Sequence, residues 1–225
     1  MTRQTQGLLL AFLGAVLLRM SFSDAYLRYV TEWMKWPILA SGIIMLLLAI
    51  GPVFLDPDDP HGDDHGHGVP KATWLLLLPG LVTFVISPPE LGSFIAERRA
   101  NQSTAVEPAV VSELDADQSN ELLLQEFVWR AQDGGDTLVD RQVKLTGFVS
   151  VEGDDWFVTR LTIGCCAADA LAFQVQVEDA AQPERDQWVE VTGTYVEGTG
   201  TRLEEAPVLT ADEVVEIKKP RQTYE

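Results

Sequence analysis

Two adjacent cysteines, Cys165 and Cys166, are the side chains best suited to chemistry, and they lie in the segment RLTIGCCAADA (160–170). Two thiols with the nearby carboxylate of Asp169 can hold a soft or borderline cation such as zinc. Neighbouring side chains on a regular strand point to opposite faces, so both thiols reach one ion only where the chain bends, and Gly164 permits a bend. The competing interpretation is a pair of buried structural cysteines, because free cysteine is among the most buried residue types.

These two cysteines do not predict a disulfide framework or a catalytic thiol. They are the only cysteines in the chain, and a bond between neighbours would be strained. The CC spacing differs from CxxC, and no histidine lies in residues 101–225 to activate a thiolate. The sequence also lacks an oxyanion device and a cofactor fingerprint, so we expect a protein that is not an enzyme.

A second group of potential ligands lies in the His- and Asp-rich loop 56–71, which contains DPDDPHGDDHGHG. This loop holds all three histidines of the protein, and imidazole with carboxylate oxygens suits zinc, copper, nickel or iron(II). A solvated polar hairpin between two helices explains the same composition. The candidate ligands are His61, His65, His67, Asp63 and Asp64.

Three apolar stretches predict that residues 1–99 form a membrane α-helical region, with spans at about 7–23, 36–55 and 73–94. The stretch 36–55 has twenty residues without a charge, enough to cross a hydrocarbon core of about 30 Å. A signal peptide is the alternative for the first stretch, but no convincing cleavage site follows it. The third stretch is interrupted by Pro79-Gly80, so a re-entrant segment stays open as an alternative.

The basic residues at the ends of these stretches give a divided prediction of orientation. Arg3 favours an N-terminus inside the cell, and three spans would then place the C-terminal domain outside. Arg98 and Arg99, which follow the third stretch, favour the opposite. We expect a multi-pass protein of the cell membrane with an extracytoplasmic C-terminal domain.

A polar linker, 100–118, precedes a predicted soluble all-β domain at 119–225. A short helix over 120–132, capped by Ser119, opens the domain and ends at DGGD (133–136). From residue 141 the pattern changes to period two, with five short strands and turn signals between them. With Gly147 and Gly193 at bending positions, an OB-fold-like five-stranded barrel is expected, and a five-stranded sandwich is the alternative.

Charge divides the chain in the same place. Residues 1–100 hold seven basic and nine acidic side chains, whereas residues 101–225 hold nine basic and twenty-five acidic ones. A domain of net charge −16 repels phosphate backbones, so nucleic-acid binding is not expected. Its surface suits cations or a basic partner.

Several segments resemble one bacterial family. GFVS (147–150), FVTRLTIGCCAADA (157–170) and VEVTGTY (189–195), together with HGHG and WLLLLPGLVTFVISPPELGS within 65–93, resemble the YcgQ-type family of bacterial membrane proteins. Members of that family are described as permease subunits that pair with a larger polytopic permease, and metal homeostasis is suggested for some relatives. The resemblance therefore implies an accessory subunit, with Cys165, Cys166 and Asp169 as functional residues.

Two hypotheses follow from the sequence. The leading one is an accessory subunit of a membrane permease, whose domain binds a metal cation, with zinc the candidate, or docks on its polytopic partner. Short spans with few polar residues do not form a transport path alone, which is why a partner in the bilayer is expected. The alternative is a membrane-tethered protein-interaction module with structural cysteines and no metal.

Overall fold

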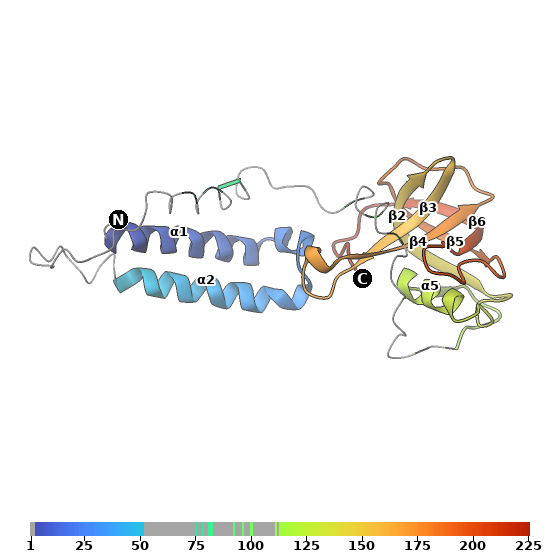
Figure 1. The fold of residues 1–225 in the computed structure, drawn as a ribbon, viewed down its shortest axis with the longest axis horizontal. Coiled ribbons are helices and arrows are strands. Elements are labelled where there is room, and N and C mark those ends of the chain that lie inside the picture. The colour runs from blue at the N-terminus through green and yellow to red at the C-terminus, as the bar shows by residue number, and fades with distance from the viewer. Residues whose placement is uncertain are drawn as a thin grey trace, which may run out of the picture. The chain divides into compact units, whose positions relative to one another are not determined.

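The computed structural model describes residues 3–51, 75, 78, 81, 82, 92, 96, 100, 111 and 113–225 (Figure 1). The chain divides into two compact units, Met1–Glu90 and Leu91–Glu225, each of which has its own contacts. Most of the predicted span 73–94 lies outside the described residues. The same holds for all five candidate ligands of the His- and Asp-rich loop, namely His61, His65, His67, Asp63 and Asp64.

The first unit contains a pair of antiparallel helices, α1 (Arg3–Phe22) and α2 (Lys35–Ile50), joined by two short 3₁₀ turns, η1 (Asp24–Arg28) and η2 (Glu32–Met34) (Figure 1). Glycines let the two backbones approach closely. A Cβ atom on Gly14 would lie 2.9 Å from the carbonyl oxygen of Gly42, and one on Gly42 would lie 3.1 Å from that of Gly14. Larger side chains at either position would force the helices apart.

One helix in the described part of the chain is long and apolar enough to cross a membrane by length and composition. It comprises Glu32–Ile50, 19 residues of mean hydropathy 1.8, of which 11% are buried. At about 1.5 Å per residue it is about 28 Å long. The helix Gln6–Phe22 is also apolar but shorter. The helix Glu32–Ile50 suggests membrane association. The number of spans and their orientation stay predictions.

The second unit contains a six-stranded sheet and the α-helix α5 (Figure 1). In chain order its elements are β1 (Asn120–Leu122), α5 (Leu124–Gln132), β2 (Gln142–Glu152), β3 (Asp155–Thr162), η5 (Ala167–Asp169), β4 (Leu171–Glu178), β5 (Trp188–Tyr195) and β6 (Val208–Ile217). The strand order is β1-β2-β3-β4-β6-β5, and β5 also pairs with β2. The β1–β2 and β4–β6 pairs are parallel, and the other pairs are antiparallel.

The expectation of a C-terminal β domain is confirmed, but its first element was predicted wrongly. Residues 120–122 form β1 and pair with β2, so the helix begins at Leu124 and not at Asn120. Ser119 therefore caps nothing: the residue before the helix is Leu123, which makes no side-chain cap. The predicted end is correct, because the helix stops at Gln132 and the chain turns at two glycines with positive φ.

Two hydrophobic clusters stabilise this unit. The larger packs α5 against the inner face of the sheet, with Phe127, Val128, Leu145, Val158 and Phe173 almost fully buried. The smaller lies against the other face of the sheet and joins residues distant in sequence, namely Ala96, Phe148, Leu161, Ile163, Ala170, Ala172, Trp188 and Tyr224. Because both faces of β3 and β4 are buried, the strands beside the cysteine segment are held on two sides.

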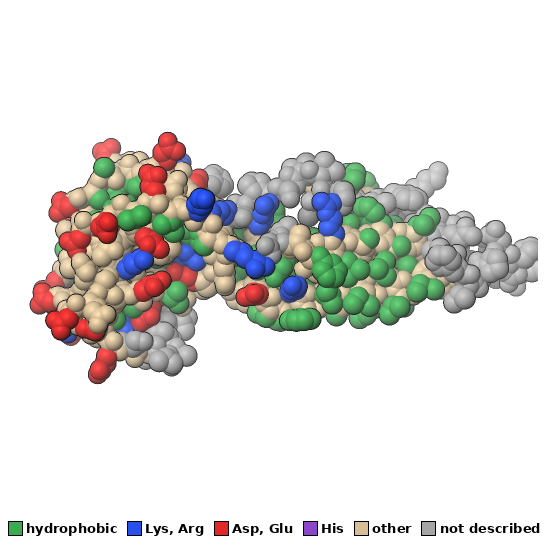
Figure 2. Space-filling model, turned by 180° about the vertical axis from the view of Figure 1, so that it is seen from behind, with side chains coloured by type: hydrophobic (Ala, Val, Ile, Leu, Met, Phe, Trp, Pro, Cys, Tyr) green, Lys and Arg blue, Asp and Glu red, His purple; other side chains and the backbone are tan. Residues whose placement is uncertain are grey.

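The surfaces of the two units differ in charge. On the face shown in Figure 2, acidic side chains are spread over the β domain, whereas hydrophobic side chains cover most of the helical pair. Large side chains such as Trp36, Leu47 and Leu48 of α2 are 60–70% exposed. An apolar surface of this kind is unfavourable in water and suits a lipid or protein environment.

Candidate metal centre

The two cysteines lie in the connection between β3 and β4, where the chain leaves the sheet and turns back. Gly164 and Cys165 form a bend, and Cys166 precedes the single 3₁₀ turn η5 in an extended conformation (φ −152°, ψ 168°). The bend that both thiols require is therefore present. It releases Cys165 and Cys166 from the alternation of a strand, so their side chains are not forced onto opposite faces.

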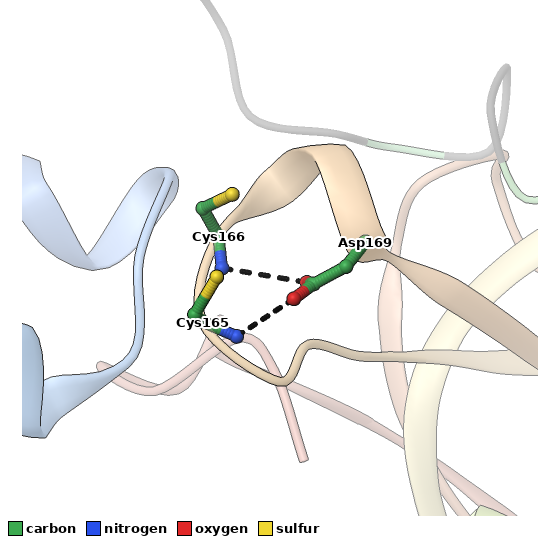
Figure 3. Close-up of side chains that lie close together, drawn as sticks. All are labelled: Cys165, Cys166 and Asp169. Carbon is green, nitrogen blue, oxygen red and sulfur yellow. Dashed lines mark hydrogen bonds between the residues drawn. The ribbon is translucent and has the colours of Figure 1, made fainter.

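Asp169 folds this connection into a closed loop (Figure 3). Its carboxylate accepts hydrogen bonds from three successive backbone amides, those of Gly164 at 3.2 Å, Cys165 at 2.9 Å and Cys166 at 3.3 Å. In return, the Cys166 sulfur accepts a hydrogen bond from the Asp169 amide, which completes a capping box around η5. Cysteine here takes the position that serine or threonine usually occupies in this motif.

Gly164 makes room for the carboxylate. A Cβ atom at this position would lie 3.1 Å from Oδ2 of Asp169, closer than most real Cβ contacts. Its φ is not positive, so the requirement is for space and not for an unusual backbone conformation. Gly164 therefore contributes to the loop by allowing the close approach of Asp169.

The loop brings three potential ligand atoms together. One from each of Cys165, Cys166 and Asp169 lie within 4.8 Å of one another. Two sulfurs bound to one tetrahedral zinc at about 2.3 Å each lie roughly 3.8 Å apart, so small side-chain rotations suffice. Cys165 and Asp169 are exposed and Cys166 is half-buried, which leaves the loop accessible to an ion. The donor set therefore fits a thiophilic or borderline cation.

Electrostatics hold the thiol of Cys165 in its neutral form. Its pKa is raised to about 11, first by the hydrogen bond to Asp169 and then by the one to Cys166. The pKa of Asp169 is lowered, chiefly because the Cys165 amide donates to it. A thiol with a raised pKa is a poor nucleophile at neutral pH, which disfavours Cys165 as a catalytic nucleophile. A bound cation would displace the thiol proton, as metals do with cysteine ligands.

The base of the loop is fixed by residues that sequence reasoning did not identify. The Glu225 amide donates to the Leu161 carbonyl at 2.9 Å, and Tyr224 forms a bridge with Leu161. The Glu225 carboxylate accepts the amides of Leu124 at 3.1 Å and Gln125 at 3.2 Å, so it caps α5. Residues 224–225 thus connect α5 to the end of β3, directly before the cysteine loop.

Arg160 is another residue to which sequence reasoning assigned no role. Its guanidinium carbon lies 4.8 Å from the ring centroid of Trp188, and it donates to the backbone carbonyl of Gln222 at 3.1 Å. Burial lowers its pKa, and the nearby Glu225 opposes that shift. Arginine stays protonated in spite of such a shift, so Arg160 contributes a fixed positive charge between Trp188 and Gln222. The one sequence signal for Arg160 is its position at the start of the distinctive RLTIGCC segment.

The β domain also contains a cavity of about 410 Å³. Glu152, Glu204 and Glu205 line it together with the amides of Gln174 and Gln176 and the ring of Phe157. No lysine or arginine is among its lining residues. These glutamates do not form a metal-binding cluster, because Cys165, Cys166 and Asp169 are the only such group among the described residues. The cavity instead suits a larger ligand or a segment with positive charge.

Comparison with known families identifies this domain. Residues 126–225 match the model of the DUF1980 C-terminal domain, from a family of bacterial membrane-associated proteins. The matched region includes nearly all of α5, the five long strands, the cysteine loop and Glu225. No curated protein matches the chain. The match supports membrane association and does not by itself name the YcgQ-type family.

Proposed function

We propose that this chain is a membrane-anchored metal-binding protein in which the loop of Cys165, Cys166 and Asp169 holds a cation such as zinc. The observation that carries the proposal is the convergence of three ligand atoms within 4.8 Å on an accessible loop. The raised pKa of Cys165 favours a metal site over a catalytic thiol. In this proposal the protein is not an enzyme.

We also propose that the β domain is an OB-fold-like barrel. The five long strands pair in the order β2-β3-β4-β6-β5 and return to β2, and β4 and β6 are parallel. This arrangement supports the OB-fold-like barrel expected from the sequence. The loop between its second and third strands would then carry the cysteines at one end of the barrel.

The cellular role that we propose is an accessory subunit of a larger polytopic permease. Support comes from the apolar helix Glu32–Ile50, from the DUF1980 C-terminal domain and from the resemblance to permease subunits. The chain would pass through the cell membrane more than once, with the β domain on the extracytoplasmic side. The histidine loop would collect ions at lower affinity, with His61, His65 and His67 as its ligands.

Zinc competition with a chromophoric chelator tests the metal site. Wild-type full-length protein in detergent is expected to withdraw zinc from the chelator, and Cys165→Ser with Cys166→Ser to lose the tighter of its binding events. The matched control replaces His61, His65 and His67 with alanine and should keep that event. Equal affinity in the double cysteine variant would contradict the proposal.

A second candidate function is docking of a basic partner segment without any metal. The net charge of −16 over residues 101–225 and the glutamate-lined cavity favour it. Capture from native membranes, with elemental analysis of the captured material, separates the two functions. A polytopic permease with stoichiometric zinc supports the first, and a partner without metal, retained by the double cysteine variant, supports the second.

A further inference from the structure

We infer that the cysteine loop is an exchange site, at which a bound cation keeps a coordination position open for a donor from outside this chain. The inference rests on the proposed metal binding and adds what the site does with its ion. The incoming donor would be a thiolate or an imidazole, the ligand types that suit the same soft or borderline cations. The ion could then pass to the next carrier without leaving protein ligands.

The number of donor atoms in the cluster leaves room for an external ligand. Within the residues that the structure describes, the cluster contains three ligand atoms and no fourth. A structural zinc site is closed by four protein ligands, whereas a site with three keeps a position for an external ligand. The exposure of Cys165 and Asp169 leaves that position accessible from solvent.

The carboxylate of Asp169 is already bound by backbone amides of the loop. Its two oxygens accept the backbone amides of Gly164, Cys165 and Cys166. A carboxylate offers about four acceptor positions, so these three hydrogen bonds leave Asp169 about one for a metal ion. Asp169 is therefore at most a single-oxygen ligand, and the two sulfurs supply most of the protein's bonds to the ion.

Hydrogen bonds within the protein hold the loop in its conformation. The three amide hydrogen bonds and the capping box define its conformation, and Ile163 and Ala170 anchor its two ends in the smaller hydrophobic cluster. Structural zinc sites differ, because there the metal supplies the folding free energy. A loop held by its own hydrogen bonds can release its ion and bind another at little conformational cost.

Absorption spectroscopy of the cobalt-loaded full-length protein in detergent provides the test. Sulfur-to-cobalt charge-transfer bands arise only from thiolate ligands, so cobalt bound by the histidine loop does not contribute to them. On titration with imidazole, we expect the charge-transfer bands to shift and saturate while they persist. Zinc transfer to a small chelator is expected to accelerate in proportion to chelator concentration, as attack at an open position requires.

The outcomes separate the inference from the proposed function. If excess imidazole leaves the charge-transfer bands unchanged and zinc transfer is independent of chelator concentration, the chain itself fills every coordination position. That result would overturn the inference and leave the proposed function standing. Absence of the bands in wild-type protein would overturn both. Cys165→Ser with Cys166→Ser is the control and should show no bands, whereas His61→Ala, His65→Ala and His67→Ala together should leave both the bands and the imidazole response unchanged.

Discussion

Glu225 links the loop base to α5, and its removal should weaken the domain by an amount that the structure allows us to estimate. Glu225→Ala leaves the amides of Leu124 and Gln125 without their acceptor, since Leu123 provides no side-chain cap. Loss of an N-terminal cap costs about 1 kcal/mol, within a range of about 0.5 to 2. For a domain of this size we therefore expect a decrease in Tm of roughly 4 °C.

Glu225→Gln separates the effect of ionisation from that of helix capping, when its free energy of unfolding is compared with that of the wild type as the pH changes. Desolvation raises the pKa of Glu225 above its ordinary value of 4.5, despite the two amides and the attraction of Arg160. Below that ordinary value the carboxyl is neutral in both folded and unfolded protein, and its contribution to stability is complete. As the pH rises through the raised pKa of the folded protein, ionisation favours the unfolded state. Wild-type protein should then lose stability relative to Glu225→Gln, by at most about 1.4 kcal/mol per pH unit.

Urea unfolding of residues 91–225, followed by tryptophan fluorescence between about pH 4 and pH 8, measures this difference. Glu197→Gln, which changes an exposed glutamate in the β5–β6 turn, is the matched control for the loss of one carboxylate. The reasoning would be refuted by wild-type protein gaining stability relative to Glu225→Gln as the pH rises. Attraction from Arg160 and the helix amides would then outweigh desolvation.

Two further predictions concern single residues. Gly193→Ala should destabilise the domain by about 1–3 kcal/mol, because its Cβ would clash with the carbonyl oxygen of Thr210 across the β5–β6 pair. An unchanged urea midpoint would contradict this close approach. Asp169→Asn should lower the pKa of Cys165 from about 11, since Asp169 is the largest cause of the shift; alkylation of the thiol would then become faster at mildly alkaline pH, and an unchanged pH–rate profile would count against the hydrogen bond.

The sequence predicts the long strands well because their side-chain pattern is local. Phe173, Val175 and Val177 alternate with polar residues and all belong to the main core. The pattern does not reveal that the other face is buried too, where Gln174 is 2% exposed and donates to the Ser150 hydroxyl. That face is covered by residues distant in sequence, and no local periodicity carries such information.

In the candidate site, too, local contacts can be predicted from the sequence and long-range contacts cannot. The bend at Gly164 and the contact with Asp169 span six residues, so turn and capping chemistry made the cluster predictable. Arg160, Tyr224 and Glu225 meet only through pairing between β3 and residues 222–225, some sixty positions apart. The same kind of long-range pairing converts Asn120–Leu122 into a strand, although its composition continues a helical stripe.

X-ray absorption of the zinc-loaded full-length protein tests the central claim most directly, because it counts the atoms bound to the metal. Two sulfur neighbours at about 2.3 Å, with the rest of the shell made of oxygen or nitrogen at about 2.0–2.2 Å, are expected. A shell of oxygen and nitrogen alone, at one zinc per chain, would place the ion away from Cys165 and Cys166 and contradict the account.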